Sequence, residues 1–228
     1  MDKQGLADPI PSLHLLRLVS PSLPVGGFSY SRGLEAAVRH GWVTTEAAAQ
    51  EWILGTLENT FAALDAPIFL RMMAALAAGD DENLLRRDAW LRASRESREI
   101  QAEDRLMGDA LLRLLADLAP ATAGRYVGRA LCYPTAFAIA AHHWRIAPSQ
   151  ALEGLMWAVT EGQVSAAVRL VPLGQTAGQR ILVNAVEVIE RGARRAEFLR
   201  DDEIGNTAIG VAIASAWHED QYSRLFRS

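Results

Sequence analysis

Residues 20–41 read SPSLPVGGFSYSRGLEAAVRHG, and this stretch decides between a nucleotide-binding loop and a bend that joins two helices. A phosphate-binding loop of the form G-x-x-x-x-G-K-[ST] needs a lysine that reaches the phosphates. Here Gly33 is followed by Leu34, and Lys3 is the one lysine in the chain. The G-x-G-x-x-G pattern fails too, because no predicted strand precedes the glycines. The stretch therefore predicts a bend.

Prolines and glycines explain how the bend forms. Pro21 and Pro24 end the preceding helix, because proline has no amide hydrogen and clashes with the turn before it. Gly26 and Gly27 supply the backbone angles that other residues avoid. A second helix then runs to Gly41, a residue type that favours helix ends. Two helices joined by a break are expected here.

Helical periodicity continues through the rest of the chain. Ile53, Leu57, Phe61 and Leu64 recur every three or four residues, which is the spacing of one helix face. We found no alternating strand pattern, internal repeat or domain boundary. The sequence predicts an all-α single domain over residues 1–228, with about eight to ten helices. The further helices are expected at about 67–79, 81–118, 134–145, 148–169, 181–189 and 209–217.

Composition narrows the class of protein. Of 228 residues, 50% are hydrophobic and 22% are charged, with a net charge of −4, so nothing points to nucleic acid or an anionic membrane. No apolar stretch approaches the roughly 18 residues of a membrane span, and the N-terminus does not resemble a signal peptide. A single cysteine, Cys132, fits a reducing compartment. We expect a cytoplasmic protein.

Two predicted helices carry more than a core pattern. Gly154, Ala158, Gly162 and Ala166 form a strip of small residues that lets another helix approach closely, either within the domain or from a second subunit. Residues 93–108 are polar nearly all round, so this segment either faces solvent or lies against polar partners. Arg95 and Glu99 have the spacing of an exposed ion pair.

A search for catalytic motifs finds none. The five histidines form no H-E-x-x-H and no zinc spacing, and no G-x-S-x-G is present. His218 with Glu219 could be a weak metal pair or ordinary helix-end polarity. Cys132 is expected to be a small buried hydrophobic residue. The sequence predicts a protein that is not an enzyme and has no metal or cofactor of its own.

The C-terminal stretch ASAWHEDQYSRLFRS combines aromatic residues and arginine, the residue types that dominate interface hot spots. Burial of Tyr222 and Phe226 would contribute about 8–12 kcal/mol at ~25 cal/mol/Å². Ordering the last eight or so residues would cost about 8–16 kcal/mol. Because these nearly cancel, residues 220–228 are expected to be mobile and to become ordered on a partner, with simple fraying as the competing view.

Four segments in order resemble one known family. LPVGGFSYSRGLE, ASRESREI, VRLVPLGQ and the terminal HEDQYSRLFRS are similar to segments of the UreF family of urease accessory proteins, over about residues 15–228. Each motif alone is weak, but four in the same order are specific. The resemblance implies an all-α chaperone that joins UreD (also called UreH) and the GTPase UreG in a complex delivering nickel to apo-urease. It also implies a homodimer within that complex.

The same resemblance implies the contact residues. The tail and last helix would contact UreD, through Tyr222, Ser223, Arg224, Leu225, Phe226 and Arg227. A second face would contact UreG, through Arg32, Glu35, Arg169 and Gln175. Nickel and GTP would be handled by the partner complex.

Two other classes remain open. One is a regulator that supplies an arginine to the GTPase, for which Arg32, Arg169 or Arg224 are the candidates. The other is a stand-alone helical enzyme, which the missing motifs disfavour.

Overall fold

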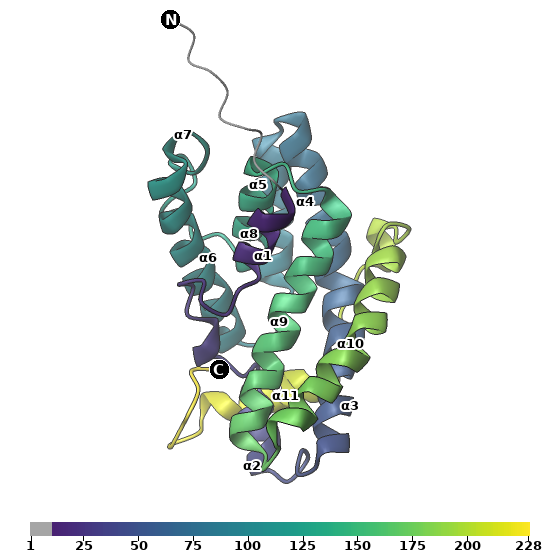
Figure 1. Ribbon diagram of the computed structural model, residues 1–228. Coiled ribbons are helices and arrows are strands. Elements are labelled where there is room, and N and C mark those ends of the chain that lie inside the picture. Colours follow the sequence, from purple (N-terminus) through teal and green to yellow (C-terminus); the bar gives the residue numbers. More distant parts are fainter. Residues whose placement is uncertain (1–10) are drawn as a thin grey trace, which may run out of the picture.

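The computed structural model describes residues 11–228, and every regular element within that range is helical (Figure 1). This confirms the all-α prediction. The elements are α1 (Pro11–Leu18), η1 (Gly27–Ser29), α2 (Leu34–Arg39), α3 (Glu46–Thr56), η2 (Leu57–Asp65), α4 (Ala66–Ala78), α5 (Asp81–Ala93), α6 (Arg98–Leu118), α7 (Pro120–Ala123), α8 (Tyr133–His143), α9 (Pro148–Leu170), α10 (Gln175–Ala196), η3 (Asp201–Glu203) and α11 (Ile209–Glu219).

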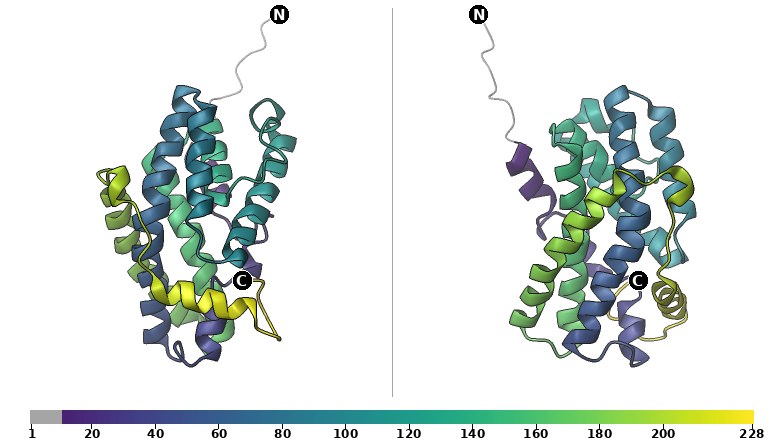
Figure 2. Two further views of the ribbon diagram at one scale, coloured as in Figure 1. Left: turned by 180° about the vertical axis from the view of Figure 1, so that it is seen from behind. Right: turned by 90° about the vertical axis from the view of Figure 1, so that its right-hand side faces the viewer.

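The long helices lie side by side, and α11 crosses them. In Figure 1, α9 runs through the middle of the molecule with α10 beside it. The left view of Figure 2 shows α11, in yellow, lying across the lower part of the longer helices, with the C-terminus close to its far end. Helix α11 and the C-terminus therefore meet the segment 20–41, which contains the bend and α2.

The expected bend is present at residues 20–33. Gly26 and Gly33 have φ of 77° and 80°, in the left-handed region that favours glycine. Gly33 is further constrained by packing, because a Cβ there would lie 2.9 Å from the backbone nitrogen of Ser215 in α11. Gly26 therefore allows the turn, and Gly33 allows the close approach of α11. The prediction of a bend is confirmed.

The segment Glu46–Ala78 is one continuous helix, whereas the sequence predicted a restart at Asp65 and Pro67. That expectation was wrong because the helix widens to a π-helix over η2, where Ala66 N donates to Phe61 O. Pro67 cannot donate to the carbonyl of Ala63, and Gly205 N donates to it instead at 3.2 Å. The missing hydrogen bond is thus supplied from a distant loop.

This continuity also corrects the expectation that no apolar stretch reaches the length of a membrane span. Glu46–Ala78 is long and apolar enough to pass that test by length and composition. Within the fold, however, 61% of its most apolar window is buried, as in the core helix of a folded domain. Its apolar residues are used in packing against neighbouring helices.

The predicted segment 81–118 is two helices, α5 and α6, separated by residues 94–97. Ser97 caps α6, and its hydroxyl accepts a hydrogen bond from Ile100 N at 3.1 Å. In the break, Arg95 turns into the interior and is 4% exposed. A continuous helix was therefore the wrong prediction for this stretch.

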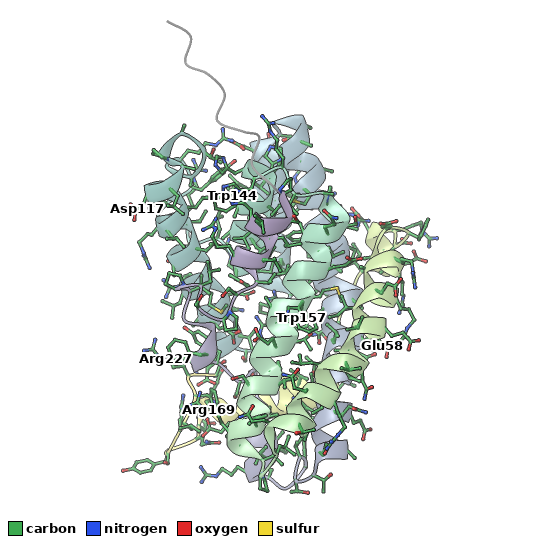
Figure 3. The ribbon with its side chains drawn as sticks, viewed as in Figure 1. Glu58, Asp117, Trp144, Trp157, Arg169 and Arg227 are labelled. Atoms are coloured by element: carbon green, nitrogen blue, oxygen red, sulfur yellow. The ribbon has the colours of Figure 1, made fainter. Side chains whose placement is uncertain are left out.

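The core consists of two hydrophobic clusters. The larger one contains Phe69 and Phe137, whose ring centres are 6.3 Å apart. The smaller one gathers side chains from α2, α3, α9 and α10 together with Phe226. Trp157, labelled on α9 in Figure 3, packs against both clusters. The C-terminal tail therefore contributes to the core.

Candidate protein-interaction surface

The C-terminal tail, residues 220–228, is fixed against α2 and α6. The amide of Ser31 donates to a terminal oxygen of Ser228 at 2.9 Å, and the Ser31 hydroxyl donates to the same oxygen. The Ser228 hydroxyl donates to Glu103 Oε2 at 2.8 Å. One residue earlier, Arg227 N donates to Ser29 O at 2.8 Å. The last two residues are therefore held by the bend at one side and by α6 at the other.

Glu35 of α2 provides the main anchor for the tail. Its Oε1 accepts from Leu225 N at 2.7 Å, and its Oε2 accepts from Phe226 N at 2.8 Å. Gln221 Nε2 also donates to Oε1, at 3.1 Å. Hydrogen bonds to an ionised, nearly buried carboxylate are stronger than those between neutral groups. Glu35 is 8% exposed and accepts all three.

His218 connects this anchor to α6. It is fully buried, with Nδ1 at 2.6 Å from Glu99 Oε2 and Nε2 at 3.3 Å from Glu35 Oε2. Arg224 Nη1 donates to the other oxygen of Glu99 at 2.5 Å. The sequence predicted neither these partners nor the burial of His218.

Phe226 occupies the smaller hydrophobic cluster and is 3% exposed. The Arg169 guanidinium lies over its ring, 4.7 Å from the ring centre, and donates to Phe28 O at 3.3 Å. Figure 3 labels Arg169 and Arg227 on the side of the molecule where the tail lies. Arg169 thus holds Phe226 and the bend together.

In the structure, these contacts hold residues 220–228 against the rest of the fold, which speaks against the predicted mobility of the tail. From the sequence, the free energy gained by burying the tail's aromatic residues nearly equals the entropic cost of ordering the tail. Whether the tail is ordered therefore depends on further contacts. Glu35, Ser31 and Glu103 supply them from within the chain. No local sequence pattern indicated these contacts, because the partners lie more than 100 residues apart.

The predicted tail residues divide into anchors and exposed side chains. Phe226 is an anchor, whereas Tyr222 is 101% exposed and Leu225 is 57% exposed. Ser223 and Arg227 have exposed side chains, although Ser223 O accepts from Gln221 and Arg227 N is bonded to Ser29. The tail therefore presents Tyr222 and Leu225 to solvent from a fixed backbone.

Helix α11 adds exposed apolar side chains next to the tail. Ile209, Ile213 and Trp217, spaced four residues apart on one face, are 73%, 39% and 39% exposed. Trp42 is 43% exposed, and its ring centre lies 4.8 Å from that of Trp217. We call these four residues the α11 surface. Clustered exposed apolar residues of this kind mark protein interaction sites.

The residues predicted for a second face do not all reach the surface. Arg32 is 5% exposed, with Nε 2.7 Å from Glu103 and Nη2 2.9 Å from Asp104. Burial alone would lower the pKa of Arg32, but these carboxylates outweigh it and raise the pKa. Glu35 lies under the tail. Arg169 and Gln175 remain exposed, at the end of α9 and the start of α10.

Arg95 belongs to the same buried network as Arg32. Its guanidinium bonds Asp65 at 2.6 Å and Asp104 at 2.6 Å, so the expected exposed pair with Glu99 was wrong. Of the two interpretations of the polar segment 93–108, packing against polar partners is the one observed. Within residues 11–228, no cluster of three or more histidine, cysteine or acidic side chains could hold a metal ion.

Comparison with known proteins identifies the family. A family model described as UreF matches residues 43–186. The chain is 56% identical over 220 residues to "Urease accessory protein UreF 2" of Brucella anthropi, covering 96% of this chain and 97% of that protein. It is 46% identical to "Urease accessory protein UreF" of Alkalilimnicola ehrlichii over 215 residues, 94% of each chain. The match to the protein of that name from Azoarcus sp. is also 46%, over 225 residues and 96% of each chain. The chain therefore belongs to the UreF family of urease accessory proteins.

Proposed function

We propose that this protein bridges UreD (UreH) and the GTPase UreG in the complex that delivers nickel to apo-urease. The family supports a role in urease maturation. The observation that carries the bridging role is the α11 surface next to the fixed tail, because it offers a protein-binding site at one end of the molecule. The chain acts as a homodimeric, non-catalytic scaffold in the cytoplasm, while its partners handle nickel and GTP.

The α11 surface and the exposed tail side chains form the UreD contact. Tryptophan and tyrosine dominate interface hot spots, and Trp42, Trp217 and Tyr222 are all accessible. Because Glu35 fixes the tail beforehand, binding does not have to order it again. The tail therefore contributes to affinity as a preformed surface.

The turn between α9 and α10 forms the UreG contact, through the exposed Arg169 and Gln175. Arg32 and Glu35 act indirectly, since they hold α2 against α6 and the tail. Arg169 touches Phe226 of the tail, which joins the two contact regions through one side chain. Binding at the tail and binding at the turn are thus physically connected.

The alternative of an arginine supplied to the GTPase has less support. Arg32 is buried between two carboxylates, Arg224 pairs with Glu99, and Arg169 lies on Phe226. Each would have to break an internal contact to reach a bound nucleotide. A scaffold that positions UreG requires no such rearrangement.

The test is co-purification of the dimeric chain with UreD. We expect Ile213→Asp on the α11 surface to abolish the complex, because a charge would be buried in an apolar contact. Val183→Asp on α10 is the matched control, since Val183 is 69% exposed but distant in sequence from α11 and the tail. Equal UreD yields from both variants would contradict the proposed surface.

A further inference from the structure

A pocket lies between the α5–α6 junction and the start of α11. Its volume is about 310 Å³. Trp90, Leu64 and Ala212 form apolar parts of its wall, and the loop 204–208 forms another side. Ile209, the first residue of the α11 surface, lines its edge and is 73% exposed. The pocket therefore adjoins the surface proposed to bind a protein partner.

Glu96, a partly buried residue, lines one wall of this pocket. Glu96 Oε1 is buried and has no hydrogen bond to the described residues. A buried charged oxygen without a hydrogen-bond donor of its own is costly, because it has lost its hydrogen bonds to water. A hydrogen-bond donor brought to this carboxylate would offset that cost, and a cationic donor would do so most effectively.

The neighbouring cations of the chain do not fill this role. Behind the pocket, two buried guanidinium groups are already shared among three carboxylates. These bonds join Arg95 to Asp65 and Asp104, and Arg32 to Glu103 and Asp104. The network has no positive charge to spare, so Glu96 adds a further acidic group next to it.

We propose that this pocket receives a basic side chain from the protein that covers the α11 surface. The identity of that protein rests on the proposed function. The further inference is that this protein presents an arginine or lysine at the edge of an apolar contact. A guanidinium suits the site well, because its fixed donors can bond a carboxylate while its stem packs against apolar walls.

Titration behaviour supports the same assignment. Burial raises the pKa of Glu96, and a hydrogen bond from its own backbone and the guanidiniums of Arg95 and Arg32 offset only part of this effect, while Asp65 adds to it. The free chain therefore holds a proton on Glu96 more readily than an exposed glutamate does. A cation binds the ionised form, so its affinity should increase as the pH rises through this raised pKa.

The first arm of the test needs no partner. Ethylguanidinium is titrated into the isolated chain while the amide signals of residues 204–208 and the Trp90 indole signal are followed by NMR. We expect saturable shifts that weaken at lower pH, disappear in Glu96→Gln and are not produced by neutral N-ethylurea. Unchanged shifts in Glu96→Gln, or none in the native chain, would overturn the proposal.

The second arm measures the affinity of the full chain for UreD. We expect Glu96→Gln to weaken binding by roughly 10- to 100-fold, because the partner's cation would be buried without its counter-charge. Glu153→Gln is the matched control, since Glu153 is an exposed glutamate that lines a different groove, between α1, α9 and α10. Equal affinities of both variants would overturn the inference and leave the proposed function standing. If the native chain fails to bind UreD, the proposed function fails, and the ethylguanidinium arm alone decides whether the site exists.

Discussion

At the scale of single residues, Glu35 contacts the C-terminal region at several points. Its two oxygens accept from two tail amides and from Gln221, and one of them faces His218. A tail that would otherwise be balanced between order and disorder is fixed by one side chain from α2. The estimate from the tail's own residues did not include these contacts.

Glu35→Ala should therefore reduce the free energy of unfolding by about 3 kcal/mol, because it removes a buried charged acceptor from several donors at once. Urea denaturation measures the change. The control is Glu51→Ala on the exposed side of α3, which should change stability by less than about 0.5 kcal/mol. Equal losses in the two variants would show that the tail contacts contribute little.

Cys132 illustrates a residue property that the sequence did predict. It is buried, and burial raises the pKa of its thiol well above the usual range, with Asp104 and Asp88 adding to the effect. The reactive thiolate is therefore nearly absent at neutral pH. The folded protein should not react with Ellman's reagent over minutes, whereas the urea-unfolded chain should react with one equivalent; fast reaction of the folded chain would contradict this burial.

At the scale of elements, the close approach of α2 and α11 depends on Gly33. A Cβ at this position would lie 2.9 Å from Ser215 N, in a backbone conformation with φ of 80°. Packing at this point places α11 across the long helices and so positions the α11 surface. A glycine in the first stretch of the chain thus determines where a helix near its end can lie.

Gly33→Ala should destabilise the fold by about 3 kcal/mol or more, because backbone strain is combined with a steric clash. Gly41→Ala is the control. Its φ of 76° carries the same strain, but nothing lies within 4 Å of the added Cβ, so it should cost only about 1–2 kcal/mol. Thermal unfolding of both variants measures the difference, and equal losses would show that α2 and α11 do not meet this closely.

How far the sequence predicts the elements depends on where their partners lie. The bend at Pro21 and Gly26 was predicted because its causes are local. The continuous helix through Pro67 was missed because the donor to Ala63 comes from Gly205. Likewise, the buried network of Arg95 could not be predicted from helix spacing. The family resemblance indicated the class of function but could not show which predicted contact residues are buried.

At the scale of the whole molecule, the tail, α11, α2 and α6 form one connected region. Hydrogen bonds accepted by Glu35, Glu99 and Glu103 connect the tail and α11 to the two other helices. The proposed binding surface is therefore already formed in the structure without a partner. A partner that met a mobile tail would instead have to order it on binding.

Truncation tests this at the same scale. Removal of residues 222–228 deletes Phe226 from the smaller cluster and leaves Glu35 without two of its donors. A mobile tail would leave the melting temperature unchanged. We expect the melting temperature to fall by several degrees, because loss of a buried aromatic residue costs about 2 kcal/mol or more. We also expect the truncated chain to lose UreD binding.

Amide hydrogen exchange of the isolated chain measures whether the tail is fixed before a partner binds. The amides of Leu225, Phe226 and Arg227 each donate to Glu35 or Ser29, so we expect their exchange to be slowed at least 100-fold relative to an unstructured peptide. The exposed Tyr222 provides the internal comparison, as no hydrogen bond from its amide is found among the described contacts. Exchange of all three amides at the unstructured rate until UreD is added would contradict the account.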